Sequence, residues 1–116
     1  MSEALTVYKV LTGEEMTALE HEGRFDVSPA DRADGFVHLS TLEQLAGTVD
    51  RHFAGRADLH VVAVDTTAQG ERLKWEPSRG GDLFPHLYGP LLLETVVAYG
   101  PLERDEDGGV KLPVTG

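Results

Sequence analysis

The chain contains no cysteine among its 116 residues. Disulfide bonds, thiolate nucleophiles and zinc sites built on thiolates are therefore excluded. Nor does it have a run of about 18 apolar residues, the length that a membrane-spanning helix needs. The first ten residues, MSEALTVYKV, show no basic segment followed by an apolar one, as a secretory signal would. These absences favour a cytoplasmic protein.

Positive charge is also scarce. Ten lysines and arginines stand against twenty aspartates and glutamates, which gives a formal net charge of −10. Binding along a nucleic-acid backbone depends on a basic stripe that releases counterions, so we expect neither a long nucleic acid nor an anionic membrane as a partner. A local basic spot is still sufficient for one phosphate. The composition therefore leaves a small anionic or nucleotide-like ligand as a partner.

The length and the apolar content of 41% are those of one packed domain, which we take as residues 1–116. Its first half alternates strands and helices: strand 6–12, helix 13–22, strand 35–40, helix 42–53 and strand 59–65. Thr12 and Glu15 have the spacing of a capping box at the start of the first helix, and Gly23 is a typical C-terminal stop. Residues 26–34 predict a loop.

The second helix carries an apolar stripe at helical spacing, which predicts one buried face. The stripe consists of Leu42, Leu45, Ala46, Val49 and Phe53. The capping box of this helix is formed by one of two pairs, Ser40–Glu43 or Thr41–Gln44. Strand 59–65, LHVVAVD, is apolar on both faces and is expected at the centre of a sheet.

The second half has strands without helices. Residues 73–90, LKWEPSRGGDLFPHLYGP, contain three prolines and three glycines and predict an irregular segment, with a short strand at 72–76. Residues 91–100 form a β-rich run, and a turn at 107–109 precedes a last short strand in a mobile tail, 105–116. This order favours an α+β fold over a doubly wound α/β fold. No Gly-rich phosphate loop joins a strand to a helix, which argues against dinucleotide-binding and P-loop folds.

His38 lies in the middle of the second strand, on the face opposite Val37 and Leu39. A histidine there is either packed and hydrogen-bonded under a loop, or catalytic. Ser40 and Thr41 follow at the start of a helix, where free N–H groups favour an anion, although capping is the commoner role of such hydroxyls. We take His38 as a candidate catalytic residue and Ser40 as a candidate ligand-binding residue.

His86 is the second candidate catalytic residue. In extended backbone His86 and Tyr88 project to the same side, and an imidazole beside a phenol suits a polar ligand. The alternative is a structural loop in which Phe84 and Tyr88 pack. No two histidines have the close spacing of a metal-binding pair, so we expect no metal site, although His38, His86 and an acidic residue are one conceivable set of ligands.

The same segment holds further candidates for ligand binding. Arg79 precedes two glycines whose backbone N–H groups can form an anion-binding turn, or it is a surface residue of a flexible turn. Trp75 either stacks on a flat ring or fills the core. Glu76 is a general base, an acceptor for a ribose hydroxyl, or the structural partner of Arg79. We expect one cleft in which His38 faces Trp75, Glu76, Arg79, Gly80, Gly81, His86 and Tyr88.

Five segments in this order resemble the DUF952 family, a set of small bacterial proteins: VYKVLT, DGFVHLST, DLHVVAVD, LKWEPSRGG and FPHLYG. That family is grouped by resemblance with the ADP-ribosyltransferase-like superfamily, which includes RNA 2′-phosphotransferases. The resemblance implies a split, mostly antiparallel β structure with flanking helices. It also implies a cleft that binds NAD or an ADP-ribosylated intermediate.

The superfamily pattern transfers to this sequence at some positions only. Its early strand carries His or Arg, where this chain has the pair Tyr8-Lys9. Its second-strand position matches His38, and its third matches His86 or Tyr88. Glu76 is the candidate for the transferase glutamate.

The resemblance implies an ADP-ribosyl- or phosphotransferase-like enzyme acting on NAD or a nucleotide phosphate, with NAD as the implied cofactor. His38 would hold a ribose or phosphate, and His86 would act in acid–base chemistry, because the ordinary pKa of histidine lies near neutrality. The alternative is a non-catalytic binding module for a small anionic ligand that uses the same cleft. A structural partner protein, with an exposed apolar patch, is a third hypothesis.

Overall fold

The computed structural model of the chain describes residues 6–25, 33–104, 106 and 108–111. Most of the predicted loop 26–34 and of the predicted mobile tail 105–116 lies outside these residues. The described part is an α+β arrangement in which the paired strands are antiparallel, in agreement with the predicted fold class. None of its helices is long and apolar enough to cross a membrane.

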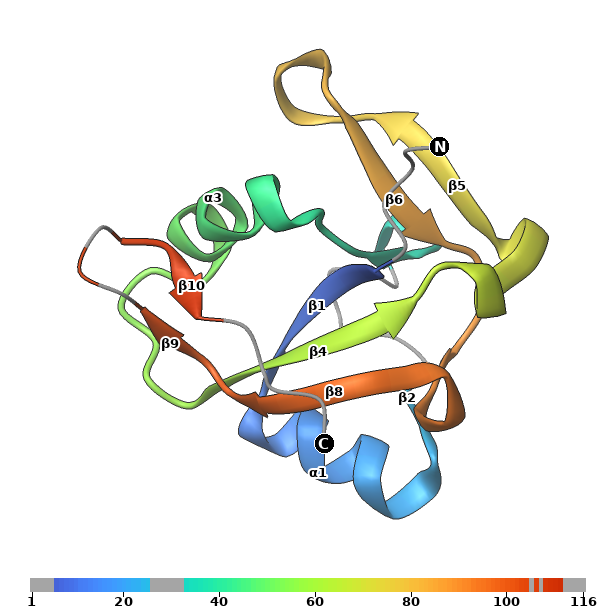
Figure 1. Ribbon diagram of the computed structural model, residues 1–116, viewed down its shortest axis with the longest axis horizontal. Coiled ribbons are helices and arrows are strands. Elements are labelled where there is room, and N and C mark those ends of the chain that lie inside the picture. The colour runs from blue at the N-terminus through green and yellow to red at the C-terminus, as the bar shows by residue number, and fades with distance from the viewer. Residues whose placement is uncertain (1–5, 26–32, 105, 107, 112–116) are drawn as a thin grey trace.

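The central sheet has three strands in the order β1 (Thr6–Thr12), β4 (Leu59–Asp65) and β8 (Val96–Pro101). These strands lie side by side across the middle of the molecule (Figure 1). β1 pairs with β4 along its whole length, from Thr6 opposite Asp65 to Thr12 opposite Leu59. The predicted strands 6–12 and 59–65 are confirmed, and so is the central position of the second.

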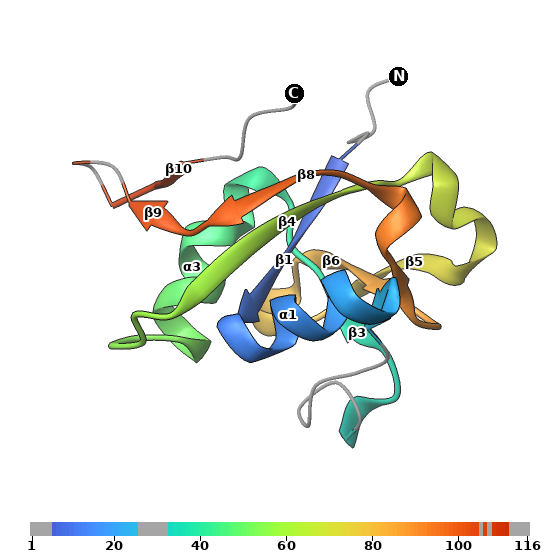
Figure 2. The same ribbon diagram turned by 90° about the horizontal axis from the view of Figure 1, so that it is seen from below.

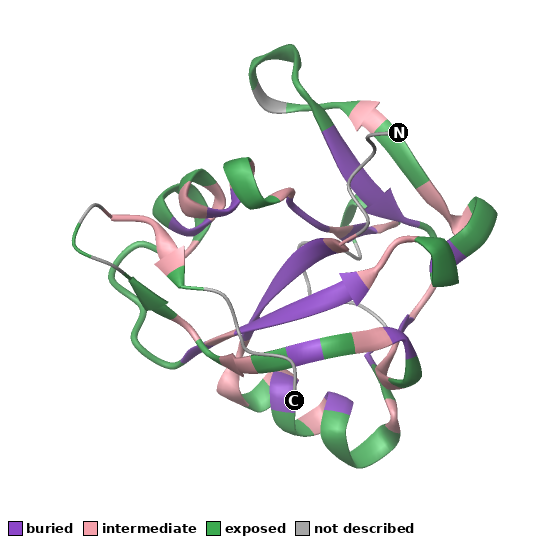
Figure 3. Cartoon of the chain, in the orientation of Figure 1, coloured by how far each residue is buried: buried purple, intermediate pink, exposed green. Residues whose placement is uncertain are grey.

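The helices α1 (Gly13–Glu22) and α3 (Leu42–His52) cover opposite faces of this sheet. On one face, Val7 and Leu11 of β1 cluster with Met16 and Leu19 of α1. On the other face, a second cluster joins β1 to α3 through Tyr8, Val10, Leu45 and Val49. The alternation of side chains along a strand produces this division. Figure 3 shows β1 and most of β4 as buried, between helices whose outer faces are exposed.

Both helices begin with capping boxes. Thr12 accepts a hydrogen bond from the backbone N–H of Glu15, and the Glu15 carboxylate accepts one in return, as predicted. Of the two alternatives for α3, Thr41 with Gln44 forms the cap. The predicted stripe of α3 is wrong at Leu42, whose exposed fraction is 51%. Leu42 is the first residue of the helix, and the apolar cluster beneath the later turns does not extend to it.

The second sheet has the order β3 (Val37–His38), β6 (Leu83–Leu87) and β5 (Leu73–Pro77). The prediction of an irregular segment at 73–90 is therefore wrong, because β5 and β6 form a regular antiparallel hairpin. Gly80 and Gly81, with φ of 71° and 85°, close its turn, where residues with a Cβ would be strained. Proline removes only a donor, and the carbonyl of Pro85 still accepts a hydrogen bond from Leu39 N at 3.1 Å.

The two sheets meet at one isolated bridge between Tyr8 of β1 and Ser40, just after β3. The backbone N–H and C=O groups of these two residues exchange hydrogen bonds of 2.8 Å in both directions. The predicted strand 35–40 is thus shorter than expected, with ladder pairing only at Val37–His38. From this junction the β5–β6 hairpin extends away from the central sheet (Figure 1).

The remaining elements are short. β2 (Arg24–Phe25) pairs with β7 (Leu91–Leu92), and β9 (Glu103–Arg104) pairs with β10 (Val110–Lys111). The predicted run 91–100 is interrupted by a 3₁₀ turn at Leu93–Thr95 before β8 begins. Two further 3₁₀ segments occupy Thr67–Arg72 and Arg79–Gly81. Two perpendicular views place the β9–β10 hairpin at the opposite end of the molecule from β5 (Figures 1 and 2).

Candidate functional site

A cavity of about 590 Å³ lies where the two sheets meet, next to α3 and the turn that follows it. Its polar lining consists of Tyr8, Lys9, Thr12, Glu15, Asp34, His38, Ser40, Thr48, His52, Arg56, Ser78 and His86. Both candidate catalytic histidines therefore line one cavity. They are directly opposite each other in the β3–β6 ladder, and their ring centroids are 5.7 Å apart.

His86 is held by a carboxylate and is only 4% exposed. Its Nδ1 lies 2.8 Å from Oε1 of Glu76, and the hydroxyl of Tyr88 donates to the same oxygen at 2.8 Å. The hydrogen bond with His86, and secondarily that from Tyr88, holds the pKa of Glu76 below its ordinary value. The same bond raises the pKa of Tyr88. At neutral pH Glu76 is therefore an ionised acceptor and Tyr88 a neutral donor.

The register of the hairpin explains this contact. Glu76 is paired with Phe84, two residues from His86, so its side chain reaches His86 diagonally on the same face of the sheet. Tyr88 follows on that face beyond the end of β6. The contact is local to the β5–β6 hairpin, whereas His38 joins it through long-range pairing of β3 with β6.

His38 forms a second carboxylate–histidine pair. Its Nε2 lies 2.8 Å from Oδ2 of Asp34, and both side chains are partly exposed at the mouth of the cavity. Phe36 contacts both histidines: its ring stacks on His86 with centroids 4.0 Å apart, and its centroid lies 4.7 Å from that of His38. The packed ring limits the orientations that both imidazoles can adopt.

The lining of the cavity is more cationic than the protein as a whole. Lys9 is 7% exposed, which is unusual for a lysine, and the exposed Arg56 makes no hydrogen bond or ion pair through its side chain with any described residue. The two acidic lining residues are already bonded, Glu15 in the cap of α1 and Asp34 with His38. An anion that enters the cavity therefore meets the guanidinium of Arg56, while both carboxylates of the lining already accept hydrogen bonds.

The hydroxyl groups of Ser40 and Thr48, which both line the cavity, contact each other. Ser40 Oγ is 2.7 Å from Thr48 Oγ1 of α3, a contact that joins the helix to the bridge between the sheets. Ser40 does not cap α3, because Thr41 does. Burial raises the pKa of Tyr8, so this phenol remains neutral well above neutral pH.

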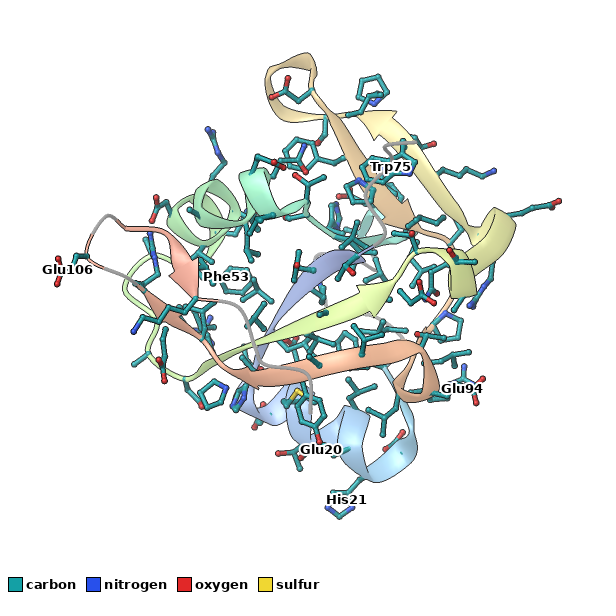
Figure 4. All side chains as sticks on the ribbon, viewed as in Figure 1. Glu20, His21, Phe53, Trp75, Glu94 and Glu106 are labelled. Carbon is teal, nitrogen blue, oxygen red and sulfur yellow. The ribbon has the colours of Figure 1, made fainter. Side chains whose placement is uncertain are left out.

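Several predicted ligand-binding residues lie away from the cavity. Trp75 is opposite Pro85 and alternates with Glu76, so it projects from the other face of the hairpin. Figure 4 shows Trp75 on β5, far from the cavity-lining Phe53 at the end of α3. Gly80 lies in the hairpin turn and lines a separate shallow hollow with residues of α3.

The expectation that all these side chains face His38 across one cleft is corrected accordingly. Gly81 lies in the same turn as Gly80 and is likewise outside the lining, and the side chain of Arg79 is outside the described part of the structure. The suggested pairing of Glu76 with Arg79 is replaced by the contacts of Glu76 with His86 and Tyr88. Ligand contacts of Trp75 and of the glycine turn stay predictions.

Several polar lining residues were not singled out as site residues from the sequence, among them Asp34, Thr48, His52, Arg56 and Ser78. The spacing of Asp34 four positions before His38 was the one local signal for a pair. His52 was interpreted only as a cation that stabilises the C-terminal end of a helix, so nothing in the sequence indicated its place in the lining. Among the described residues, no group of three or more histidine, aspartate or glutamate side chains is placed to hold a metal ion.

These features define a small α+β protein with a histidine-lined cavity between two antiparallel sheets. The chain belongs to the family described as protein of unknown function (DUF952), whose model matches residues 10–99. It is similar to the crystal structure of protein CC0527 from Caulobacter crescentus, with 46% identity and a TM-score of 0.83 over 91% of this chain and 93% of that one. The solution NMR structure of CC0527 is 47% identical, with a TM-score of 0.78 over 92% and 91% of the two chains. No curated protein matches the chain.

Proposed function

We propose that the protein binds a small anionic, nucleotide-like ligand in this cavity. We propose further that it acts as an ADP-ribosyl- or phosphotransferase-like enzyme on NAD or a nucleotide phosphate. The observation that carries the proposal is the charge of the lining. In a protein whose acidic residues outnumber its basic ones two to one, the lining balances Lys9 and Arg56 against Glu15 and Asp34, and both carboxylates already accept hydrogen bonds. The Arg56 side chain makes no ion pair with any described residue, and a guanidinium in this state is suited to an anionic group.

The arrangement of the sheets supports an ADP-ribosyltransferase-like fold. Two antiparallel sheets share one bridge, at Tyr8 and Ser40, helices flank the central sheet, and the cavity lies at the junction. This agrees with the split β structure that the sequence resemblance implies. Lys9, from the pair that occupies the early-strand position, contributes to the lining.

In this proposal His86 supplies acid–base chemistry, and His38 contacts the ribose or phosphate. A specific observation also favours the non-catalytic alternative, a binding module for a small anion. Glu76, the candidate for the transferase glutamate, is engaged by both His86 and Tyr88. A carboxylate held in this way is not free to contact a ligand without losing those bonds. An assay of turnover therefore distinguishes the transferase from the non-catalytic binding module.

The test is a ligand-observed NMR screen with NAD, ADP-ribose, ADP and inorganic phosphate, using the wild type, Arg56→Ala and Arg24→Ala. Arg24 is an exposed residue of β2 outside the cavity lining, so its variant controls for the loss of one positive charge. We expect binding that Arg56→Ala weakens by about threefold to tenfold, in line with one solvent-exposed hydrogen bond of about 1 kcal/mol, and that Arg24→Ala leaves unchanged. Equal effects of the two variants, or no binding of any probe, would count against the cavity as an anion site.

Ligands that bind are then assayed for release of nicotinamide or phosphate. Product formation that is lost in His86→Ala supports the transferase. Binding without product at any pH supports the non-catalytic module.

A further inference from the structure

The imidazole of His86 has one nitrogen with a hydrogen-bond partner and one without a partner among the described residues. Nδ1 is hydrogen-bonded to Glu76, and the imidazole of His86 makes no other hydrogen bond with any residue that the structure describes. Yet the side chain is about nineteen-twentieths buried and lines the cavity. A buried polar atom without a partner costs free energy, so its retention at a cavity wall points to a ligand.

Glu76 determines which nitrogen carries the proton in neutral His86. An ionised carboxylate accepts hydrogen bonds and cannot donate them, and Oε1 of Glu76 also accepts from the hydroxyl of Tyr88. Nδ1 of His86 must therefore be protonated. In the neutral imidazole Nε2 then has a lone pair and acts as an acceptor. The stacked ring of Phe36 limits rotation that would exchange the two nitrogens.

We infer that Glu76 is a positioning residue that presents Nε2 of His86 to the cavity as a hydrogen-bond acceptor, and that the ligand donates a hydroxyl to it. The anionic group of the ligand is then held elsewhere, on the side of Arg56. Ionised phosphate and carboxylate oxygens are acceptors and do not pair with an unprotonated nitrogen. The ligand class is therefore a hydroxyl-bearing anion, such as a ribose phosphate. This inference rests on the proposed function, because it names the part of the ligand that His86 contacts.

The tautomer is measured without any ligand. Long-range ¹H–¹⁵N correlation spectra of uniformly labelled protein, recorded at a pH where the imidazole is neutral, distinguish Nδ1–H from Nε2–H. We expect Nδ1–H in the wild type and a shift toward Nε2–H in Glu76→Gln, which keeps the shape but removes the charge. Glu71→Gln, at an exposed glutamate outside the cavity lining, should leave the spectrum of His86 unchanged. An Nε2–H tautomer in the wild type would overturn the inference.

The hydroxyl is tested with inorganic phosphate, ADP, 2′-deoxy-ADP and 3′-deoxy-ADP. We expect ADP to move the Nε2 resonance of His86 and phosphate alone to leave it in place. One of the two deoxy analogues should bind about tenfold more weakly than ADP, the effect of leaving one buried acceptor without its donor. This discrimination should shrink in His86→Ala, and in Glu76→Gln if the alanine variant does not fold.

Failure of the hydroxyl assignment and failure of the proposed function give different results. If ADP binds but both deoxy analogues bind equally well, or if phosphate alone protonates His86, the hydroxyl assignment is wrong while the anion site stands. If neither ADP, its analogues nor phosphate binds, the proposed function fails and the hydroxyl assignment fails with it.

Discussion

The hydrogen bond between Ser40 and Thr48 predicts an asymmetric response to removal of either hydroxyl. Oγ1 of Thr48 lies 3.2 Å from the carbonyl oxygen of Gln44, to which it donates its only proton. Ser40 must then be the donor in the 2.7 Å contact. Thr48→Val keeps the side-chain shape but leaves the Ser40 hydroxyl, 3% exposed, without a partner among the described residues. Ser40→Ala leaves Thr48 bonded to Gln44.

The magnitudes follow from burial. A buried donor without an acceptor costs about 1–3 kcal/mol, whereas losing one of two contacts of Thr48 costs about 1 kcal/mol or less. Thr48→Val should therefore be the more destabilising variant. Adding Ser40→Ala to Thr48→Val should restore about 1 kcal/mol, because it removes the unpaired hydroxyl.

The assay is urea unfolding of the wild type, the two single variants and the double variant, followed by circular dichroism. With a urea m-value of about 1–3 kcal/mol/M, a loss of about 2 kcal/mol lowers the midpoint by roughly 1 M. Additive effects, or a Thr48→Val variant as stable as Ser40→Ala, would refute the reasoning. That result would mean that water in the cavity solvates Ser40, and its hydroxyl would then be available to a ligand.

Three further predictions concern α3 and the Glu76 carboxylate. Leu45→Ala should cost about 2–5 kcal/mol in urea unfolding, because Leu45 is 1% exposed, whereas Leu42→Ala should change stability by less than about 0.5 kcal/mol; equal costs would contradict the packing. The lowered pKa of Glu76 stabilises the fold above the ordinary value of 4.5, and this contribution is lost as the pH falls through the folded value. Glu76→Gln should therefore lose less unfolding free energy than the wild type when the pH is lowered from about 5 to about 3; parallel curves would argue against the contact. Tyr88→Phe removes the smaller hydrogen-bond contribution, so the pKa of Glu76, followed by ¹³C NMR, should rise while staying below 4.5 because the bond with His86 remains.

Local signals predicted the elements of the first half of the chain. The capping box at Thr12, the stop at Gly23 and the apolar run 59–65 are properties of neighbouring residues, and each has the predicted structure. The error at Leu42 has a different origin. Helical spacing defines a stripe, but only tertiary packing decides how many of its members meet the sheet.

The predicted short strand 72–76 corresponds to β5, but β6 and its pairing with β5 were missed because the sequence contains opposing signals. Proline and glycine are typical of loops, and both occur within a few residues of the turn at 79–81. Antiparallel pairing tolerates these residues here, since the glycines form the turn and Pro85 still offers its carbonyl. The density of polar side chains was therefore interpreted as irregular structure, whereas strand alternation divides them between two faces. Trp75 and Glu76 are neighbours in sequence and for that reason project oppositely.

The site combines contacts between residues that are close in sequence with contacts between residues that are far apart. This separation along the chain explains which contacts could be predicted. Glu76, His86 and Tyr88 come from one hairpin, so a regular extended backbone alone could have brought them together. His38 is 48 residues from His86, and their proximity depends on the pairing of β3 with β6, which no local pattern encodes. Arg56 enters the lining only because α3 packs across the sheet and delivers the turn that follows it. A cavity assembled from four separate segments, 8–15, 34–40, 48–56 and 78–86, has its geometry fixed by the fold as a whole. A ligand site requires side chains that are held in place before the ligand arrives, and a fold that fixes the cavity lining meets this requirement.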